Sequence, residues 1–182
     1  MPAPFNKNSL DYLLIYNNLK NNKFLCKLNP NDITILNIII TFILLWLLYK
    51  KKFFIVFLTL VIVGRVLDCL DGIVARRCNK LSLFGNFIDH FCDGLFSIGI
   101  LAIILYKYPN LNTIIRYIFK GVIIILMGVF IAVSLNANFI SYRIYKNKLV
   151  QIYHDNTILF RTLYAIGGYY FKDIMITFNI KI

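Results

Sequence analysis

Long apolar runs separated by short charged stretches dominate the chain after residue 32. The first run, 33–49, carries no charge and is rich in Ile and Leu. A second run starts at Phe53, directly after three consecutive lysines, and continues to Gly64, beyond which charged residues interrupt it. Two more runs cover 84–106 and 114–135. Because a membrane-spanning helix needs about 20 mostly apolar residues, this pattern predicts four transmembrane helices.

The C-terminal part of the chain has a weaker pattern. Residues 157–171 and 174–182 are apolar enough for two short helices, divided by charged residues. We therefore predict an all-α integral membrane protein, a helical bundle of about six transmembrane helices, four of them clear from the sequence. Residues 1–32 are expected to form an N-terminal juxtamembrane segment, with residues 33–182 as the transmembrane domain. Within that segment, residues 9–20 could form a short amphipathic helix on the membrane surface.

Basic residues set the predicted orientation. The 182 residues include 20 Lys and Arg against 8 acidic residues, a net charge of +12. With the N-terminus in the cytoplasm, ten basic residues of the flanking segments lie inside and four lie outside, three of these being the lysines at 50–52. Cytoplasmic loops carry such an excess, so we predict a multi-pass protein with a cytoplasmic N-terminus. Because the basic residues end apolar runs, they favour contact with membrane lipids, and no nucleic-acid partner is expected.

The four cysteines are Cys26, Cys69, Cys78 and Cys92. They contain no CxxC pair and suggest no disulfide framework. We therefore expect them to be structural thiols, since free cysteine is commonly buried. His90 and Cys92 are close enough in the sequence to share a metal ion, but two neighbouring ligands do not define a site.

Acidic residues concentrate in one segment. All eight are Asp, and four of them lie between residues 68 and 93. Asp68 and Asp71 are three residues apart, and Asp89 and Asp93 are four apart, so each pair shares one helix face. Two helices joined by the polar turn RCNKLS would present the four carboxylates across a shared groove. The other residues on these faces are small or basic: Gly72, Ala75, Arg76 and Gly85.

Four carboxylates near a bilayer require compensation. Insertion scales give a cost of about 2.5–3.5 kcal/mol for each charged residue at the centre of a span. Arg65 and Arg76 would offset part of this, and oxygen ligands at this density suit Mg²⁺ or Mn²⁺. Two such cations would hold a diphosphate and stabilise the attacking and leaving oxygens. The alternatives are acids at helix ends facing solvent, salt-bridged helices, or an Asp-lined path of a channel or transporter.

The acidic segment matches a known motif. The spacing D-x2-D-G-x2-A-R-x8-G-x3-D-x3-D is met without a gap by residues 68–93, and it resembles that of the class I CDP-alcohol phosphatidyltransferases, integral membrane enzymes of phospholipid synthesis. The segment NPNDIT at 29–34 is similar to the P-N-x-x-T entry to the first helix of that family. The resemblance covers about residues 29–106.

This resemblance implies a six-helix fold and transfer of a phosphatidyl group from CDP-diacylglycerol to an alcohol acceptor, with release of CMP. It further implies two divalent cations, Mg²⁺ or Mn²⁺, with the active site facing the cytoplasm. Asp93 is the implied general base. The implied metal ligands are Asp68, Asp71, Asp89 and Asp93. The implied nucleotide-binding residues are Gly72, Ala75, Arg76, Gly85, Asn31 and Thr34.

The identity of the alcohol stays open at this point. Glycerol 3-phosphate, inositol and serine suit the compact chain length. The segment DHFCDG at 89–94 is also similar to the DHGCDS of the longer choline and ethanolamine phosphotransferases, which move a phospho-alcohol from a CDP-alcohol to diacylglycerol. A phosphorylated acceptor would need a second basic pocket. The candidates for that pocket are Arg116, Lys120, Arg143, Lys146 and Arg161.

One alternative function and one question of assembly also stay open. A catalytically inactive, lipid-binding membrane protein could retain the same fold, although the intact motif argues against it. Members of this family often form pairs, so a homodimer is a possible assembly.

Overall fold

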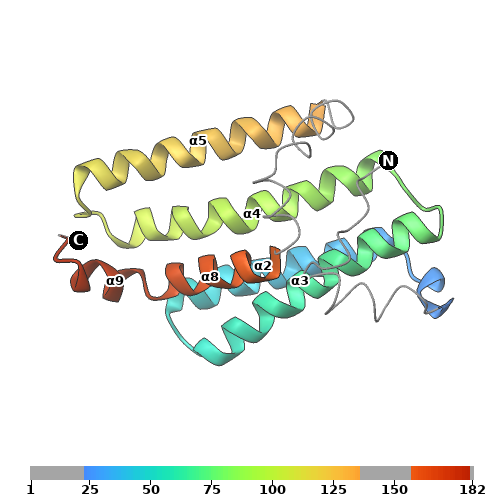
Figure 1. The fold of residues 1–182 in the computed structure, drawn as a ribbon, viewed down its shortest axis with the longest axis horizontal. Coiled ribbons are helices and arrows are strands. Elements are labelled where there is room, and N and C mark those ends of the chain that lie inside the picture. Colours follow the sequence, from blue (N-terminus) through green and yellow to red (C-terminus); the bar gives the residue numbers. More distant parts are fainter. Residues whose placement is uncertain (1–22, 136–156, 181–182) are drawn as a thin grey trace.

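The computed structural model describes residues 23–135 and 157–180, which form an all-helical bundle without strands (Figure 1). The predicted amphipathic helix at 9–20 lies outside the described residues. Four long helices are followed by two short ones, as the apolar runs predicted. The elements are η2 (Lys23–Lys27), α2 (Pro30–Lys50), α3 (Phe54–Arg77), α4 (Leu83–Lys107), α5 (Thr113–Leu135), α8 (Thr157–Tyr169) and α9 (Phe171–Thr177).

Local sequence signals explain where the long helices begin and end. Pro30 occupies the first turn of α2, where its missing N–H is not needed. At the other end, Lys51 adopts a left-handed conformation and its N–H caps the last carbonyls of α2. The side chain of Ser82 accepts a hydrogen bond from the Gly85 N–H and so caps the start of α4.

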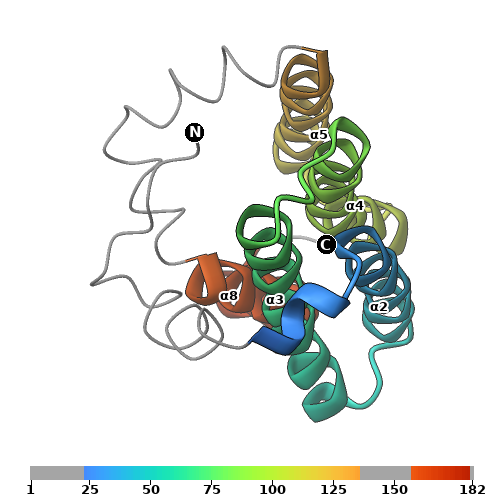
Figure 2. The same ribbon diagram turned by 90° about the vertical axis from the view of Figure 1, so that its right-hand side faces the viewer.

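Helix α2 is central to the packing. It packs against both α3 and α4, while α8 contacts the same two helices and α5 lies outside α4 (Figure 2). Although α3 and α4 are consecutive in the chain, they are held together mainly by α2 and α8, each of which packs against both of them. Two glycines permit close helix contacts: a Cβ at Gly99 would lie 2.6 Å from Leu45 of α2, and a Cβ at Gly168 would lie 2.6 Å from Ile100 of α4.

The larger apolar cluster occupies one half of the bundle, whereas a smaller one, formed by Leu25, Ile33, Ile73 and Val74, packs η2 and the start of α2 against the end of α3. In the larger cluster, the second half of α2 meets the start of α3, the second half of α4 and the C-terminal helices. The acidic residues of α3 and α4 therefore lie in the opposite half, beside the start of α2. The larger cluster includes Leu44, Leu47, Phe57, Val61, Phe96, Ile100, Ile104, Ala165 and Tyr169.

The outer surface of the bundle is strongly apolar. Large apolar side chains of α2, among them Leu36, Phe42 and Trp46, are about half exposed. A soluble monomer rarely exposes such a continuous apolar face, so this surface suits contact with lipid. Within the described residues, Pro30–Lys50 and Phe87–Lys107 are long and apolar enough to cross a membrane. The first half of α3 is equally apolar, but charged residues interrupt its second half.

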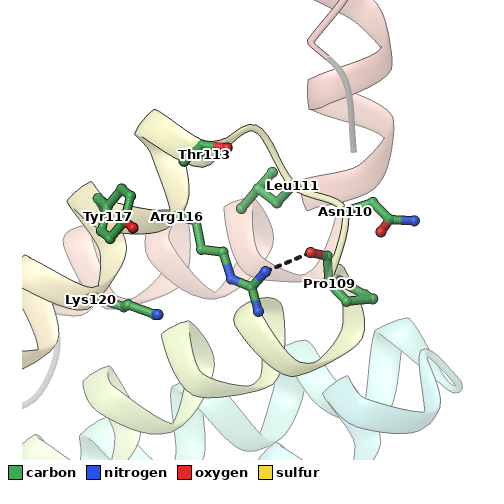
Figure 3. A pocket seen from close by; sticks show the side chains of 7 residues that line it. All are labelled: Pro109, Asn110, Leu111, Thr113, Arg116, Tyr117 and Lys120. Atoms are coloured by element: carbon green, nitrogen blue, oxygen red, sulfur yellow. Dashed lines mark hydrogen bonds between the residues drawn. The ribbon is translucent and has the colours of Figure 1, made fainter.

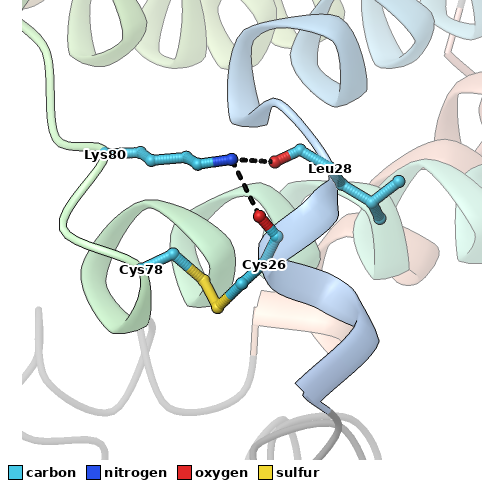
Figure 4. The surroundings of a disulfide bond; sticks show 4 residues. All are labelled: Cys26, Leu28, Cys78 and Lys80. Carbon is cyan, nitrogen blue, oxygen red and sulfur yellow. Dashed lines mark hydrogen bonds between the residues drawn. A yellow bond between two sulfur atoms is a disulfide. The ribbon is translucent and has the colours of Figure 1, made fainter.

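The prediction that all four cysteines are free thiols is wrong. Cys26 and Cys78 form a disulfide across 52 residues of sequence (Figure 4). The bond ties η2 to the residue that caps α3, and the Lys80 ammonium donates to the carbonyls of Cys26 and Leu28 at 2.9 and 2.8 Å. No local spacing in the sequence indicates this disulfide, because the two cysteines come together only through the tertiary packing of η2 against the end of α3. Cys69 and Cys92 are buried thiols outside this disulfide, as predicted.

Candidate active site

The four clustered aspartates do approach one another, as the helix-face argument predicted. Asp68 and Asp71 lie in the second half of α3, and Asp89 and Asp93 lie in the first half of α4. Asp89 is near enough to interact with each of the other three. Carboxylates from two helices therefore lie near enough to influence one another in the polar half of the bundle.

Asp71 is fixed by a contact from α2. The Thr34 hydroxyl lies 2.6 Å from Asp71 Oδ2 and 3.1 Å from the Pro30 carbonyl. Thr34 is 2% exposed and Asp71 5% exposed, so water does not compete for this hydrogen bond. A hydrogen bond to an ionised group is shorter and stronger than a neutral one. Thr34 therefore holds one oxygen of Asp71 in place.

Asp68 lies between two arginines. Arg65, one helical turn earlier on α3, forms a salt bridge with Asp68 Oδ2. Arg161 Nη1 of α8 lies 3.8 Å from the same oxygen. The other oxygen, Oδ1, is buried and has no hydrogen-bond partner within the described residues. The predicted compensation by Arg65 is thus observed, and Arg161 adds a second positive charge.

Asp93 differs from Asp68 in its exposure. Its side chain is 49% exposed, compared with 6% for Asp68, and its Oδ1 forms a salt bridge with Arg161 Nη2. The side chain of Arg161 is itself only 11% exposed, and its guanidinium lies over the ring of Phe96. Of these two carboxylates, Asp93 is the one that a soluble molecule can reach.

The carboxylates are chemically suited to bind a divalent cation. Oxygen donors from four Asp side chains are the ligands that Mg²⁺ and Mn²⁺ prefer, and the buried, unpartnered Oδ1 of Asp68 supplies a free donor. No three of the described His, Cys or Asp side chains already converge as a ligand cluster. Arg161 instead contributes the positive charge between Asp68 and Asp93.

The expected nucleotide-binding residues lie around the same end of α3 and α4. The Arg76 guanidinium lies beside Gly72, where a Cβ would come within 2.9 Å of its Nη2. A Cβ on Gly85 would come within 2.9 Å of Asn31 Oδ1, so the start of α2 lies against the start of α4. Arg76 is exposed, and Ala75, one residue before it, is half-buried.

The five candidates for a second basic pocket separate in the structure. Arg161 reaches the carboxylates, which its position in a short, interrupted apolar run did not reveal. Arg116 and Lys120 lie at the start of α5, beside the C-terminal end of α4, and therefore cannot serve an acceptor at the carboxylates in the first half of α4. The prediction is wrong for these two because α5 begins where α4 ends. Arg143 and Lys146 lie outside the described residues.

Cys92, the free cysteine next to Asp93, has a structural role in helix packing. The side chain of Cys92 is buried, and its sulfur lies 3.6 Å from the Thr41 hydroxyl of α2. This contact packs α4 against α2. The suggested pairing of Cys92 with His90 as metal ligands gains no support from a third described ligand.

Comparison with known proteins agrees with this arrangement. Archaetidylinositol phosphate synthase of Pyrococcus horikoshii is 36% identical over 74 residues, which is 41% of this chain. The matched region spans 39% of that relative's length. No solved structure matches the chain.

The family model for CDP-alcohol phosphatidyltransferase matches residues 27–180, which include every helix from α2 to α9 and all four clustered aspartates. The chain therefore belongs to the CDP-alcohol phosphatidyltransferase family, whose members are membrane-embedded and use divalent metal ions.

Proposed function

We propose that this chain is a phosphatidyltransferase of phospholipid biosynthesis. It would transfer the phosphatidyl group of a CDP-linked lipid, such as CDP-diacylglycerol, to an alcohol and release CMP. The observation that carries this proposal is Arg161 of α8, which lies between Asp68 of α3 and Asp93 of α4 and so links the acidic faces of the two helices. Family membership supports the same reaction class.

The carboxylates would hold the divalent cations that the family uses. When bound, such cations neutralise the diphosphate and stabilise the attacking and leaving oxygens. The chain prepares this site in advance: Thr34 fixes Asp71, and Arg65 fixes Asp68. We assign Thr34 to this positioning role. The proposed ligands are Asp68, Asp71, Asp89 and Asp93.

Asp93 is the proposed general base. The acceptor hydroxyl would give its proton to the Asp93 carboxylate while its oxygen bonds to the β-phosphorus of the CDP-lipid. The bond from that phosphorus to the bridging oxygen breaks, and CMP leaves with that oxygen. The exposure of Asp93 supports this role, because the acceptor must reach the base.

The nucleotide would lie over the small residues near the end of α3. Gly72 and Ala75 lie on one face of α3 beside the exposed guanidinium of Arg76, which supplies positive charge for the phosphates. Gly85 and Asn31 border the same end of the bundle from α4 and α2. Small side chains here let a nucleotide approach the helix backbone closely.

We further propose that the acceptor carries a phosphate group. Arg161 supports this, because its guanidinium lies at the exposed Asp93 and its positive charge would attract the phosphate of an acceptor that reaches this base. The name of the relative, archaetidylinositol phosphate synthase, supports an inositol phosphate. Glycerol 3-phosphate carries the same group on a smaller alcohol.

The test is a screen of acceptors with the purified protein in lipid nanodiscs. CMP release from CDP-diacylglycerol is measured with inositol phosphate, glycerol 3-phosphate, inositol and serine, and from CDP-choline with diacylglycerol. We expect CMP release with a phosphorylated acceptor and little with inositol or serine. Release with serine alone would refute the phosphorylated acceptor, whereas no release with any pair would refute the enzyme itself and favour an inactive, lipid-binding protein.

We also propose that the N-terminus and the carboxylates face the cytoplasm, as the loop charges indicate. The Cys26–Cys78 disulfide lies at this same end, and reducing systems keep most cytosolic cysteines as thiols. A membrane-impermeant thiol reagent resolves the orientation. For a cytoplasmic site, Cys78 is labelled in reductant-treated cells only after the cells are permeabilised. Labelling of intact cells after treatment with a reductant would place the site outside.

A further inference from the structure

A second polar hollow lies at the opposite end of the bundle from the carboxylates. It has a volume of about 300 Å³ and is formed by the turn between α4 and α5 and the first two turns of α5 (Figure 3). Lys107, near this turn, follows Asp93 by fourteen positions on α4, about 21 Å along the helix axis. The hollow is therefore separate from the proposed active site.

Two cations line this hollow without an acidic partner. Arg116 and Lys120 are four residues apart on one face of α5, and the two side chains point toward the same space in Figure 3. No Asp or Glu occurs anywhere from residue 94 to residue 154, and neither cation forms an ion pair within the described residues. Like charges at this spacing repel each other, so an anion shared between them would stabilise the helix.

The arginine is held ready for such an anion. Arg116 Nη1 donates to the Pro109 carbonyl at 2.7 Å, which fixes the direction of the guanidinium. Its Nε is buried and has no hydrogen-bond partner in the described part of the chain. A buried donor without a partner is unfavourable. A phosphate in the hollow would bring acceptor oxygens next to this guanidinium.

The surroundings indicate an amphipathic ligand. Tyr117 at the rim is 68% exposed, and the Lys120 ammonium lies 5.8 Å from the centre of its ring. Farther along the cationic face of α5, exposed Ile124 and Met127 follow Lys120 at spacings of four and three residues. Cations at the helix start and apolar side chains one to two turns deeper match a phospholipid, with its phosphate at the surface and its chains alongside the helix.

We propose that Arg116 and Lys120 form a binding site for the phosphate of an anionic phospholipid, distinct from the substrate site. The hollow is at the lower end of the size range of ligand pockets, which suits a headgroup rather than a whole lipid. The alternative is that both side chains extend to the membrane surface without binding one lipid. This proposal does not depend on the proposed transferase activity.

The test measures thermal unfolding of the purified protein in detergent with three probes: dioleoyl phosphatidylglycerol, dioleoyl phosphatidylcholine and inorganic phosphate. The variants are Lys120→Gln, the double variant Arg116→Gln with Lys120→Gln, and Lys107→Gln as the matched control. Lys107 ends α4 at the same end of the bundle but lies by Tyr49 instead of the hollow. Unfolding in phosphatidylcholine shows whether each variant is folded.

We expect phosphatidylglycerol to raise the unfolding temperature of the wild type more than phosphatidylcholine does. The apparent dissociation constant should rise about tenfold in Lys120→Gln. The difference between the lipids should vanish in the double variant and persist in Lys107→Gln. Inorganic phosphate should compete with phosphatidylglycerol because the two share the bound group.

Three results would overturn the proposal. Equal stabilisation of the wild type by both lipids would remove the anionic preference. An unchanged response of the double variant would assign lipid binding elsewhere. Stabilisation by inorganic phosphate with no added effect of phosphatidylglycerol would make the ligand a soluble phosphate compound and not a lipid. If Arg116→Gln prevents folding, the single variant Lys120→Gln still decides between these outcomes.

Discussion

Replacing Thr34 by valine tests whether the contact to Asp71 prepares the site. Valine keeps the volume and branching of threonine but removes the hydroxyl that lies 2.6 Å from Asp71 Oδ2. Both residues are almost fully buried, so water cannot easily replace the lost donor. The Asp71 carboxylate would be left with one oxygen unpartnered on the α2 side.

The expected effect follows from the strength of such a contact. A hydrogen bond to a charged group contributes about 1.5–3 kcal/mol, and each 1.4 kcal/mol corresponds to a factor of ten. If Thr34 positions Asp71 for the reaction, the rate of CMP release should fall by about tenfold or more in Thr34→Val. Thr34→Ser, which keeps the hydroxyl, should retain most of the rate.

Thr41→Val is the matched control. Thr41 lies seven residues later on the same face of α2 and is 3% exposed. Its hydroxyl donates to the Asn37 carbonyl at 2.9 Å and lies against the Cys92 sulfur. This variant loses a buried hydroxyl of the same kind but leaves the carboxylates untouched, so its rate of CMP release should stay close to that of the wild type.

The assay is CMP release from CDP-diacylglycerol in nanodiscs, with the unfolding temperature of each variant measured in parallel. A rate in Thr34→Val within twofold of the wild type would refute the positioning role. An equal loss in Thr34→Val and Thr41→Val would also refute it, because the effect would then come from packing of α2.

Three further outcomes are expected. Arg161→Lys keeps one positive charge but loses the contact of the guanidinium with both Asp68 and Asp93. It should therefore raise the KM for a phosphorylated acceptor about tenfold, with little change in the KM for CDP-diacylglycerol. Equal changes in both KM values would place Arg161 in a structural role. Excess EDTA should abolish CMP release, and Mg²⁺ or Mn²⁺ should restore it; full activity in EDTA would contradict the metal requirement. Replacing Cys26 and Cys78 by serine should lower the unfolding free energy by about 4 kcal/mol, since the bond closes 52 residues of chain. Chemical denaturation measures this change, and an unchanged unfolding free energy would show that the disulfide does not stabilise the fold.

Much of the fold could be predicted from the sequence because the signals are local. An uncharged run of apolar residues forms a long helix wherever it lies, and the four predicted runs agree with α2 to α5 to within a few residues at most boundaries. The second run is the exception, since α3 continues beyond Gly64 to Arg77. The charged residues that interrupt its apolar pattern remain helical because they face other polar groups inside the bundle, such as Thr34 and Arg161.

The site was predictable only where helix periodicity determines it. The spacing of the aspartates places each pair on one face, and the structure brings the two pairs together. The contributions of Thr34 and Arg161 depend on which helices pack against α3 and α4, which periodicity does not encode. The Cys26–Cys78 bond was missed for the same reason, since its two residues meet only through tertiary packing.

The most direct test of the central claim is the stoichiometry of the reaction in wild type and Asp93→Asn. Asparagine matches the size of the carboxyl group but cannot accept the proton of the acceptor. Asp173→Asn is the control, because Asp173 pairs with Lys51 at the other end of the bundle. We predict one phosphodiester product for each CMP released in wild type and Asp173→Asn, and almost no release in folded Asp93→Asn. Unchanged release of CMP by folded Asp93→Asn would contradict the account.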